Sequence, residues 1–400
     1  MSEIDQSDLF GNGDKEFDWG KASALTWSQF NPSQPINEGN LFVGRIDQIN
    51  RLLSIIYEGG AHAIIYGERG VGKTSLSNIL KYKISPALKD IGFIRVNCVS
   101  EDTYLSLWSN ALYDFKSNDG IYSSDLLKDD TRPFVLTKIL ESLPRLKKTV
   151  FIFDEFDRIT DEKLKLSMAD TIKYFSDHPS NITILIIGVG SSITELFGSH
   201  PSIQRCCAQI NMPRMLNKEL REILDERKTA IGLSIKEKVI GDIINIAQGL
   251  PVYVHLLGRE SFLAAIERKS RVVEERDLEA ALDSAIERAQ ESLKQEYKNA
   301  VFSTKPKNTY KEVLLACAMC ANSNDMGGFS ASDIRPALSK ILKRPIILQS
   351  YIRLLGNLCT TEHGEVLKKT GGTGRVQYYF SNPALPPYIK ITGKKAGLIS

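Results

Sequence analysis

Residues 67–74 read Gly-Glu-Arg-Gly-Val-Gly-Lys-Thr and fit the pattern G-x-x-x-x-G-K-[ST] at every fixed position. The apolar run 61–66 comes directly before them and predicts a buried strand, and residues 75–82 have the spacing of a helix. A glycine-rich turn between a strand and a helix directs backbone N–H groups and the helix dipole at one point, which suits a phosphate group. The stretch therefore predicts a phosphate-binding loop in a parallel α/β sheet.

Each residue type in this loop has a separate task. Glycine adopts positive φ and lets the backbone approach a ligand without a Cβ in the way. Lys73 is expected to reach the β- and γ-phosphates of a nucleotide, and the Thr74 hydroxyl is expected to bind Mg²⁺, which prefers oxygen ligands. The residues expected to contact the nucleotide are Gly67, Glu68, Arg69, Gly70, Val71, Gly72, Lys73, Thr74 and Ser75.

A second acidic motif follows about 80 residues later, where residues 149–153 are apolar or β-branched and run into Asp154 and Glu155. We expect a buried strand with two carboxylates at its C-terminal end, the edge at which open α/β sheets bind ligands. Asp154 would orient Mg²⁺ and Glu155 would polarise the attacking water. An acidic turn after a core strand is the alternative. Together the two motifs favour an ATPase with ATP and Mg²⁺ as cofactors, and they disfavour a small-molecule kinase.

The composition is that of a chain with sizeable apolar cores. Its 400 residues are 42% hydrophobic, enough for two or three domains. No run approaches 18 apolar residues and the first residues are polar and acidic, so we expect neither a signal peptide nor a membrane span. Six cysteines lie mostly in apolar runs, and the pair Cys317 and Cys320 is expected to pack in a helix rather than bind a metal. These features favour a cytoplasmic protein.

Positive charge is concentrated at the C-terminal end of the chain. Residues 305–400 hold 14 Lys and Arg against 5 Asp and Glu, a formal charge of +9, whereas residues 1–304 carry −6. Lys and Arg supply most of the sequence-independent affinity for nucleic acid phosphates. The asymmetry indicates a DNA-binding end, with a merely solvated basic surface as the alternative.

The pattern along the chain predicts four parts. They are a flexible N-terminal arm over 1–35, a P-loop ATPase domain over 36–215, a helical lid domain over 216–303 and a winged-helix domain over 304–400. Trp19 and Trp27 indicate that some of the arm docks on the rest of the protein. The predicted strands of the ATPase domain are 61–66, 92–97, 150–153, 183–188 and 209–212.

The last domain is expected to have three helices, at 310–321, 332–342 and 346–357, followed by a β-hairpin over 365–380. Three helices and a two-stranded wing make a winged helix. The expected contacts to double-stranded DNA are Arg353 on the recognition helix and Lys368, Lys369 and Arg375 on the wing. Winged helices also bind proteins, so the shape leaves a protein partner open.

Taken in order, these motifs resemble the AAA+ ATPases of the origin-recognition and helicase-loader type. The resemblance covers about residues 36–392 and includes the stretch Leu-Phe-Val-Gly-Arg at 41–45. It implies an AAA+ fold in which Val43 and Arg45 pack by the adenine. It also implies that Ser191, in the strand over 182–192, senses the γ-phosphate, and that Arg205 reaches the nucleotide of a neighbouring molecule. A strand-end turn for Ser191 and a surface ion pair for Arg205 are the alternatives.

The lid departs from that family. Residues 248–253 read Gln-Gly-Leu-Pro-Val-Tyr, a Gly-x-Pro that is similar to the STAND class of signalling ATPases, in which the proline contacts the nucleotide. The resemblance therefore implies a nucleotide contact by Pro251 and a slow switch. Two functions stay open: a DNA-binding AAA+ ATPase of initiator, loader or transposition-regulator kind, and a STAND-like regulatory or defence ATPase whose winged helix holds a protein. Either is expected to form a homo-oligomer or to have its site completed by a partner protein.

Overall fold

Two separate compact units make up the computed structural model. We call Pro35–Pro213 the sheet unit, and we call the described residues up to Gln34 together with those from Arg214 onward the helical unit. The structure describes residues 17–39, 41–58, 60–83, 91–115, 122–128, 131–142, 148–178, 181–190, 193–198, 201–304, 308–321, 328–370 and 376–399. Among these residues, no helix is both long enough and apolar enough to cross a bilayer.

A parallel sheet forms the centre of the sheet unit. Its described strands are β1 (His62–Gly67), β2 (Ile91–Asn97), β3 (Lys148–Asp154), β4 (Ile182–Val189) and β5 (Cys207–Asn211), in the order β2-β3-β4-β1-β5. Every neighbouring pair is parallel, so the carboxyl ends of the strands share one edge. The strands β1, β3 and β4 are buried along almost their whole length, as expected where helices cover both faces. The predicted α/β fold class is confirmed.

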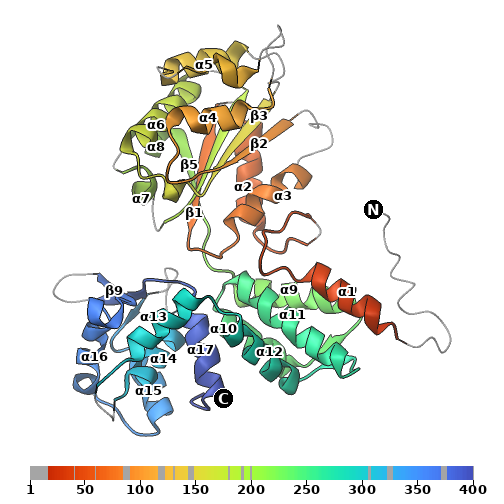
Figure 1. Ribbon diagram of the computed structural model, residues 1–400, viewed down its shortest axis with the longest axis vertical. Coiled ribbons are helices and arrows are strands. Elements are labelled where there is room, and N and C mark those ends of the chain that lie inside the picture. The colour runs from red at the N-terminus through yellow and green to blue at the C-terminus, as the bar shows by residue number, and fades with distance from the viewer. Residues whose placement is uncertain are drawn as a thin grey trace. The chain divides into compact units, whose positions relative to one another are not determined.

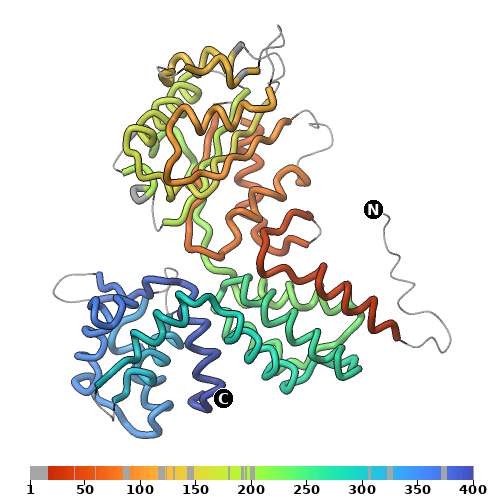
Figure 2. Tube along the Cα trace, in the orientation of Figure 1, coloured from red at the N-terminus to blue at the C-terminus, as the bar shows by residue number. Residues whose placement is uncertain are grey.

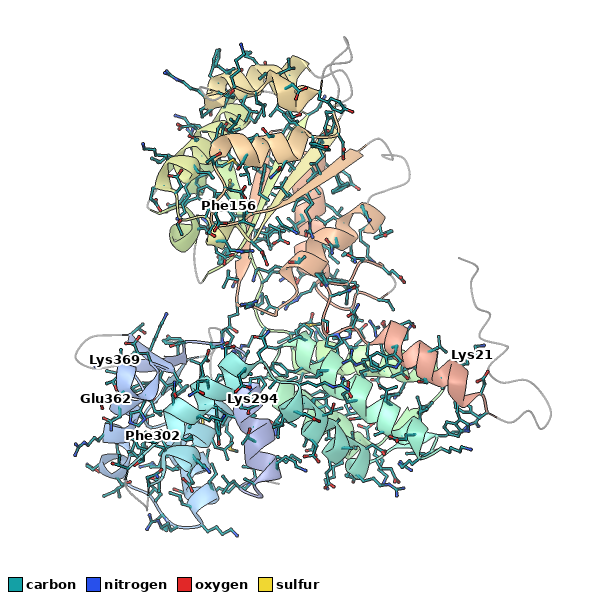
Figure 3. The ribbon with its side chains drawn as sticks, in the orientation of Figure 1. Lys21, Phe156, Lys294, Phe302, Glu362 and Lys369 are labelled. Atoms are coloured by element: carbon teal, nitrogen blue, oxygen red, sulfur yellow. The ribbon has the colours of Figure 1, made fainter. Side chains whose placement is uncertain are left out.

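Helices pack against this sheet or against the helices that cover it (Figure 1). They are α2 (Ile46–Tyr57), α3 (Lys73–Lys83), α4 (Tyr104–Leu112), α5 (Pro133–Ser142), α6 (Glu162–Asp177), α7 (Ile193–Phe197) and α8 (Pro201–Cys206), with the short 3₁₀ turns η3 (Ser123–Leu126) and η4 (Phe156–Arg158). Aromatic side chains fix the helices in place. Trp108 of α4 lies between the rings of Phe151 and Phe153 of β3, with centroids 5.3 and 5.1 Å away. Phe156, labelled in Figure 3, stacks on Phe197 and holds η4 against α7.

The helical unit contains the lid and the winged helix. The lid consists of α9 (Asn217–Ile231), β6 (Ser234–Ile235), α10 (Glu237–Ala247), α11 (Pro251–Glu267), β7 (Val272–Val273), α12 (Glu275–Glu287) and α13 (Glu291–Val301). The winged helix consists of α14 (Tyr310–Cys320), β8 (Phe329–Ser330), α15 (Ile334–Leu342), η5 (Leu348–Ser350), α16 (Ile352–Asn357), η6 (Thr361–His363), β9 (Leu367–Thr370), β10 (Gln377–Phe380) and α17 (Leu385–Lys395). The first two predicted helices and both strands of the hairpin are present, and β8 and α17 are additions. The third predicted helix, 346–357, is helical only over Ile352–Asn357, because its first half forms the 3₁₀ turn η5 instead.

Helix α17 joins the winged helix to the lid. It packs against α14 on one side and against α10 and α12 on the other. Lys390 is buried and donates to the backbone carbonyl of Asn245 at 2.9 Å, and burial lowers the pKa of Lys390 to about 8. Lys394 and Lys395 form ion pairs with Asp242 and Asp283. The lid and the winged helix therefore share one compact unit.

Part of the expected flexible arm is an ordered helix, α1 (Trp19–Gln29), which packs on α9 and α11 (Figure 2). Phe30 is fully buried beside Phe262. The ring of Phe30 lies so close to Gly258 that a Cβ on that glycine would be 2.6 Å from it. The guanidinium of Arg259 lies over the ring of Trp27. The docking that Trp19 and Trp27 indicated is therefore present, whereas the polar composition of the arm did not indicate a helix.

The docking of α1 predicts a stability difference between two aromatic substitutions. Phe30→Ala should lower the free energy of unfolding of the helical unit by about 3 kcal/mol, because it empties a buried site. Trp27→Ala should cost about 1 kcal/mol or less, since Trp27 is half exposed. Urea unfolding followed by circular dichroism measures both, and cleavage of residues 17–34 by protease should speed up only in the Phe30 variant. Equal stability of the two variants would contradict the docking.

Candidate nucleotide-binding site

The loop between β1 and α3 has the backbone of a phosphate cradle. Gly67, Gly70 and Gly72 have φ of 152°, 86° and 94°, in the region that favours glycine. A Cβ on Gly67 would lie 2.5 Å from the carbonyl oxygen of Met212, so the loop requires a glycine there. A Cβ on Gly72 would meet no described atom within 4 Å, so that side of the loop is open.

Lys73 is the first residue of α3, and its ammonium group folds back over the loop. Nζ donates to the carbonyl oxygens of Gly67 at 3.0 Å and Glu68 at 2.8 Å. Burial lowers the pKa of Lys73 to about 8, although the charges of Asp157, Asp154 and Glu68 act in the opposite direction. A desolvated cation at the start of a helix is complementary to an anion.

Thr74 and Asp154 meet at the carboxyl edge of the sheet. The Thr74 hydroxyl donates to Oδ2 of Asp154 at 2.9 Å across 80 positions of sequence. Asp154 is buried, and its Oδ1 accepts the backbone N–H of Glu155. A hydroxyl and a carboxylate side by side, next to the ammonium of Lys73, are the oxygen donors that Mg²⁺ takes in a phosphate site. These residues therefore fit a nucleotide with its metal.

Two residues that the sequence analysis did not single out complete this edge. Arg95 of β2 lies 3.7 Å from Oδ2 of Asp154 and also donates to the hydroxyl of Ser77. Asp157 accepts the backbone N–H of Val189 at 2.7 Å, which ties η4 to the end of β4, and its charge is the largest that favours protonated Lys73. Two features of the sequence could have identified them: Arg95 is a lone cation in an apolar strand, and Asp157 is a further acid soon after Asp154.

Glu155 differs from its neighbour. It is exposed, has φ of 57°, and its carboxylate pairs with Arg158 at 2.9 Å. Both side chains are about half exposed, so the pair contributes little to stability and holds the carboxylate loosely. The role of Glu155 in water activation stays a prediction.

The other residues predicted near the loop have backbone partners. Arg45 is buried and donates to the carbonyl oxygens of Val71 at 3.3 Å and Pro213 at 2.5 Å. Val43 is buried as well. The Ser75 hydroxyl accepts the backbone N–H of Ile36 at 3.0 Å. Arg45 and Ser75 thus shape the loop and its helix, and nucleotide contacts by Val43, Arg45 and Ser75 stay predictions.

Pro251 opens α11 in the helical unit, at the first helical position that suits proline. Gln248 and Gly249 before it have φ of 49° and 80°, and a Cβ on Gly249 would lie 2.6 Å from Cβ of Arg214. The backbone N–H of Met215 donates to the carbonyl of Gly249 at 2.9 Å. The Gly-x-Pro turn is therefore bound to the chain where it enters this unit, and its nucleotide contact stays a prediction.

Arg205 lies in the last turn of α8, two residues before β5, and pairs with Asp177 at 3.4 Å on the surface. Because β1 and β5 are parallel, this is the amino edge of the sheet. Six residues of β1 separate that edge from the phosphate loop, which is roughly 20 Å. Arg205 therefore lies far from the phosphate loop of its own chain. Ser191 lies outside the described residues.

The predicted DNA contacts are exposed where the structure describes them. Arg353 lies on α16, and Lys368 and Lys369 lie on β9, where Figure 3 labels Lys369. Their cross-strand partners on β10 are Tyr379 and Tyr378. Arg375 falls outside the described residues.

Comparison with known proteins agrees with this geometry. Residues 56–197 match the family model described as AAA domain. The match includes the phosphate loop and the acidic end of β3, so this part of the sheet unit is similar to AAA domains, which have a P-loop NTPase fold. The expected resemblance to AAA+ ATPases is confirmed. No curated protein sequence matches the chain.

Several solved structures are similar over nearly the whole chain. The Walker-type ATPase of Pyrococcus abyssi is 15% identical, with 90% of this chain and 99% of that chain covered and a TM-score of 0.55. The ORC2 protein of Aeropyrum pernix, in ADPNP–ADP complexes, is 15% identical over 92% and 98% of the two chains, with a TM-score of 0.49. The ORC1 protein of Aeropyrum pernix, in complex with DNA, is 15% identical over 90% and 95%, with a TM-score of 0.48. At such identities the likeness concerns the fold alone.

The lowered pKa of Lys73 predicts how nucleotide binding depends on pH. Below about pH 8 the ammonium is charged and affinity should be constant; above it affinity should fall by up to about tenfold per pH unit, because the bound phosphates require the proton. Titration with a fluorescent ATP analogue from pH 6.5 to 9.5 measures this. Lys73→Ala should bind weakly at every pH. A flat profile in the unmodified protein would contradict the assignment.

Proposed function

We propose that the protein is an ATP-binding, slowly hydrolysing AAA+ switch of initiator, loader or transposition-regulator kind that binds duplex DNA through its winged helix. The observation that carries the nucleotide part is the Thr74–Asp154 contact beside the buried ammonium of Lys73. Gly67, Gly70, Gly72 and their neighbours would hold the phosphates, and Thr74 and Asp154 would hold Mg²⁺. When bound, the metal neutralises phosphate charge during transfer to water.

Slow turnover is supported by the interactions that the site residues already make. Lys73 donates to two loop carbonyls, and Glu155 pairs with Arg158. Each group must give up these partners before it serves a phosphate or a water molecule, which raises the barrier to reaction. A switch needs nucleotide to favour one state by differential contacts, and a shift from 1:99 to 99:1 takes roughly 5.5 kcal/mol.

Arg205 is proposed to act on the nucleotide of a neighbouring copy. Its distance from its own phosphate loop excludes a role there, and its pair with Asp177 is exposed and readily exchanged. An arginine that reaches a partner's γ-phosphate couples hydrolysis to assembly. The proposal includes Ser191 as a γ-phosphate sensor and Pro251 as a nucleotide contact of the lid.

Substitution of Glu155 tests the ATPase assignment. Glu155→Gln should bind ATP normally and hydrolyse it at least about a hundredfold more slowly, because the amide cannot accept the proton of the attacking water. Arg158→Ala removes the partner of Glu155 and is the matched control; its rate should equal or exceed that of the unmodified protein. Phosphate release under single-turnover conditions measures both. Unchanged hydrolysis by the Glu155 variant would remove that residue from its role.

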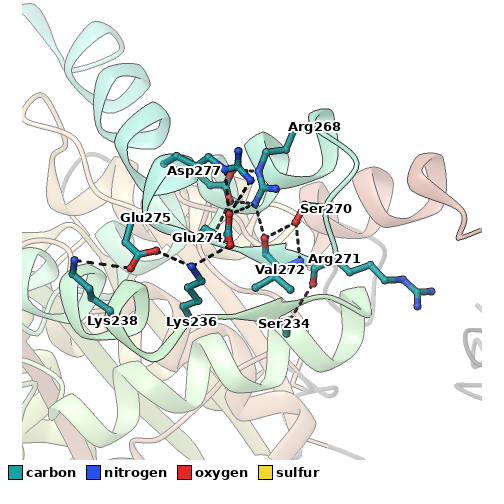
Figure 4. Close-up of polar contacts among 11 residues, drawn as sticks. Ser234, Lys236, Lys238, Arg268, Ser270, Arg271, Val272, Glu274, Glu275 and Asp277 are labelled. Carbon is teal, nitrogen blue, oxygen red and sulfur yellow. Dashed lines mark hydrogen bonds and ion pairs between the residues drawn. The ribbon is translucent and has the colours of Figure 1, made fainter.

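DNA binding is supported by cations without acidic partners. Eight described Lys and Arg of the winged helix lie more than 4 Å from every described carboxylate: Lys311, Arg335, Lys340, Lys343, Arg344, Arg353, Lys368 and Lys369. The lid differs. There Lys236 pairs with Glu274 and Glu275, and Arg268 pairs with Asp277 (Figure 4). The uncompensated charge of the winged helix is therefore a local excess that suits a polyanion.

Charge reversal on the wing tests this surface. Lys368→Glu with Lys369→Glu should weaken duplex binding and lower the slope of log affinity against log salt by about 1.8, because two phosphate contacts are lost. Lys163→Glu with Lys173→Glu, on the exposed face of α6, makes the same charge change elsewhere and should have little effect. Fluorescence anisotropy with ATP present, from 50 to 200 mM salt, measures both. Equal loss in the two variants would contradict a role for the wing, and no binding at low salt would favour the STAND-like alternative with a protein partner.

A further inference from the structure

The turn η5 and the start of the short helix α16 expose apolar side chains. Ile347 is 67% exposed, and Leu348 and Ile352 are each 39% exposed. Gln349 lies among them and is exposed as well. We call Ile347, Leu348, Gln349 and Ile352 the reading face. Three neighbouring apolar side chains on the surface of a small domain indicate contact with a partner.

The reading face is rigidly supported. Tyr351 lies behind it, almost completely buried, and its hydroxyl donates to the carbonyl of Ala331 at 2.7 Å. The backbone N–H groups of Ser350 and Tyr351 donate to the carbonyls of Ile347 and Leu348, which fixes the turn before α16. Side chains held in this way can meet a partner without a large loss of conformational entropy.

We propose that the reading face selects A·T base pairs in the major groove, an inference that rests on the proposed DNA binding. Base edges are contacted by residues at the N-terminal end of a recognition helix, and the reading face comprises the first residue of α16 and three residues of the turn before it. Apolar side chains contact the 5-methyl group of thymine, and a glutamine binds N6 and N7 of adenine with two hydrogen bonds. The reading face holds both kinds of side chain and has no charged residue of its own.

The charges around the reading face favour DNA over a protein as the occupant. Lys343 and Arg344 precede it, and Arg353 follows Ile352, and none of the three has a described carboxylate within 4 Å. An apolar strip bordered by unpaired cations matches a groove whose floor carries methyl groups and whose rims carry phosphates. Arg353 is one position from Ile352, about 100° around the helix, so the two exposed side chains leave α16 in different directions.

Thymine-to-uracil replacement tests the inference with the full-length protein. Three 20-base-pair duplexes are compared by fluorescence anisotropy: one of A·T pairs only, the same sequence with uracil in place of thymine, and one of G·C pairs. The first should bind most tightly. Uracil lacks only the methyl group, so affinity should fall about fourfold for each methyl group contacted.

Ile352→Ala should bind the thymine and uracil duplexes with nearly equal affinity, whereas Leu166→Ala, an exposed apolar residue of α6, should keep the difference. Salt dependence should be the same in both variants. Equal binding of thymine and uracil duplexes by the unmodified protein would overturn the inference and leave DNA binding intact. Absence of duplex binding would overturn both the inference and the proposed DNA binding. If Ile347→Asp no longer bound a protein partner but kept its affinity for the duplex, that result would also overturn the inference and assign the reading face to the protein.

Discussion

The hydrogen bond between Thr74 and Asp154 is the constraint on which the sheet unit depends. It joins the first turn of α3 to the end of β3, although β4 lies between β1 and β3 in the sheet. Only a parallel arrangement brings both groups to one edge, because all carboxyl ends then point the same way. Lys73, Arg95 and Asp157 gather around this contact, so the chemistry of the site follows from strand order.

Each of the two stretches of chain that connect the units is linked by hydrogen bonds to the phosphate loop or to the helix that follows it. On the way into the sheet unit, the backbone of Ile36 donates to Ser75, the residue after Thr74. On the way out, Arg45 bridges the carbonyls of Val71 and Pro213. Under the proposed function, a nucleotide that moves the loop would act on both connections together. The lid and the winged helix would respond as one body because α17 binds them to each other.

The sequence predicted the sheet, the phosphate loop and the acidic strand end well, because those segments have strong local patterns. Eighty residues, 68–147, lie between β1 and β3, yet Thr74 and Asp154 were both identified from the local motifs in which they lie. Arg95 was missed because its partner is distant in sequence. Docking of the arm was predicted from Trp19 and Trp27, but the helix α1 was missed because its apolar residues are few and the helices it packs on, α9 and α11, are distant in sequence. Strand β8 has two residues, too short for any periodicity.

The sheet unit is inserted between α1 and the helices that bind it, and this determines the order of events on the ribosome. Phe30 is synthesised about 200 residues before Arg227, His255 and Phe262, which surround or anchor its segment. At the usual 5–20 residues per second, that delay is roughly 10–40 seconds. During translation the nascent segment must stay soluble with its aromatic side chains uncovered, while the inserted sheet folds first.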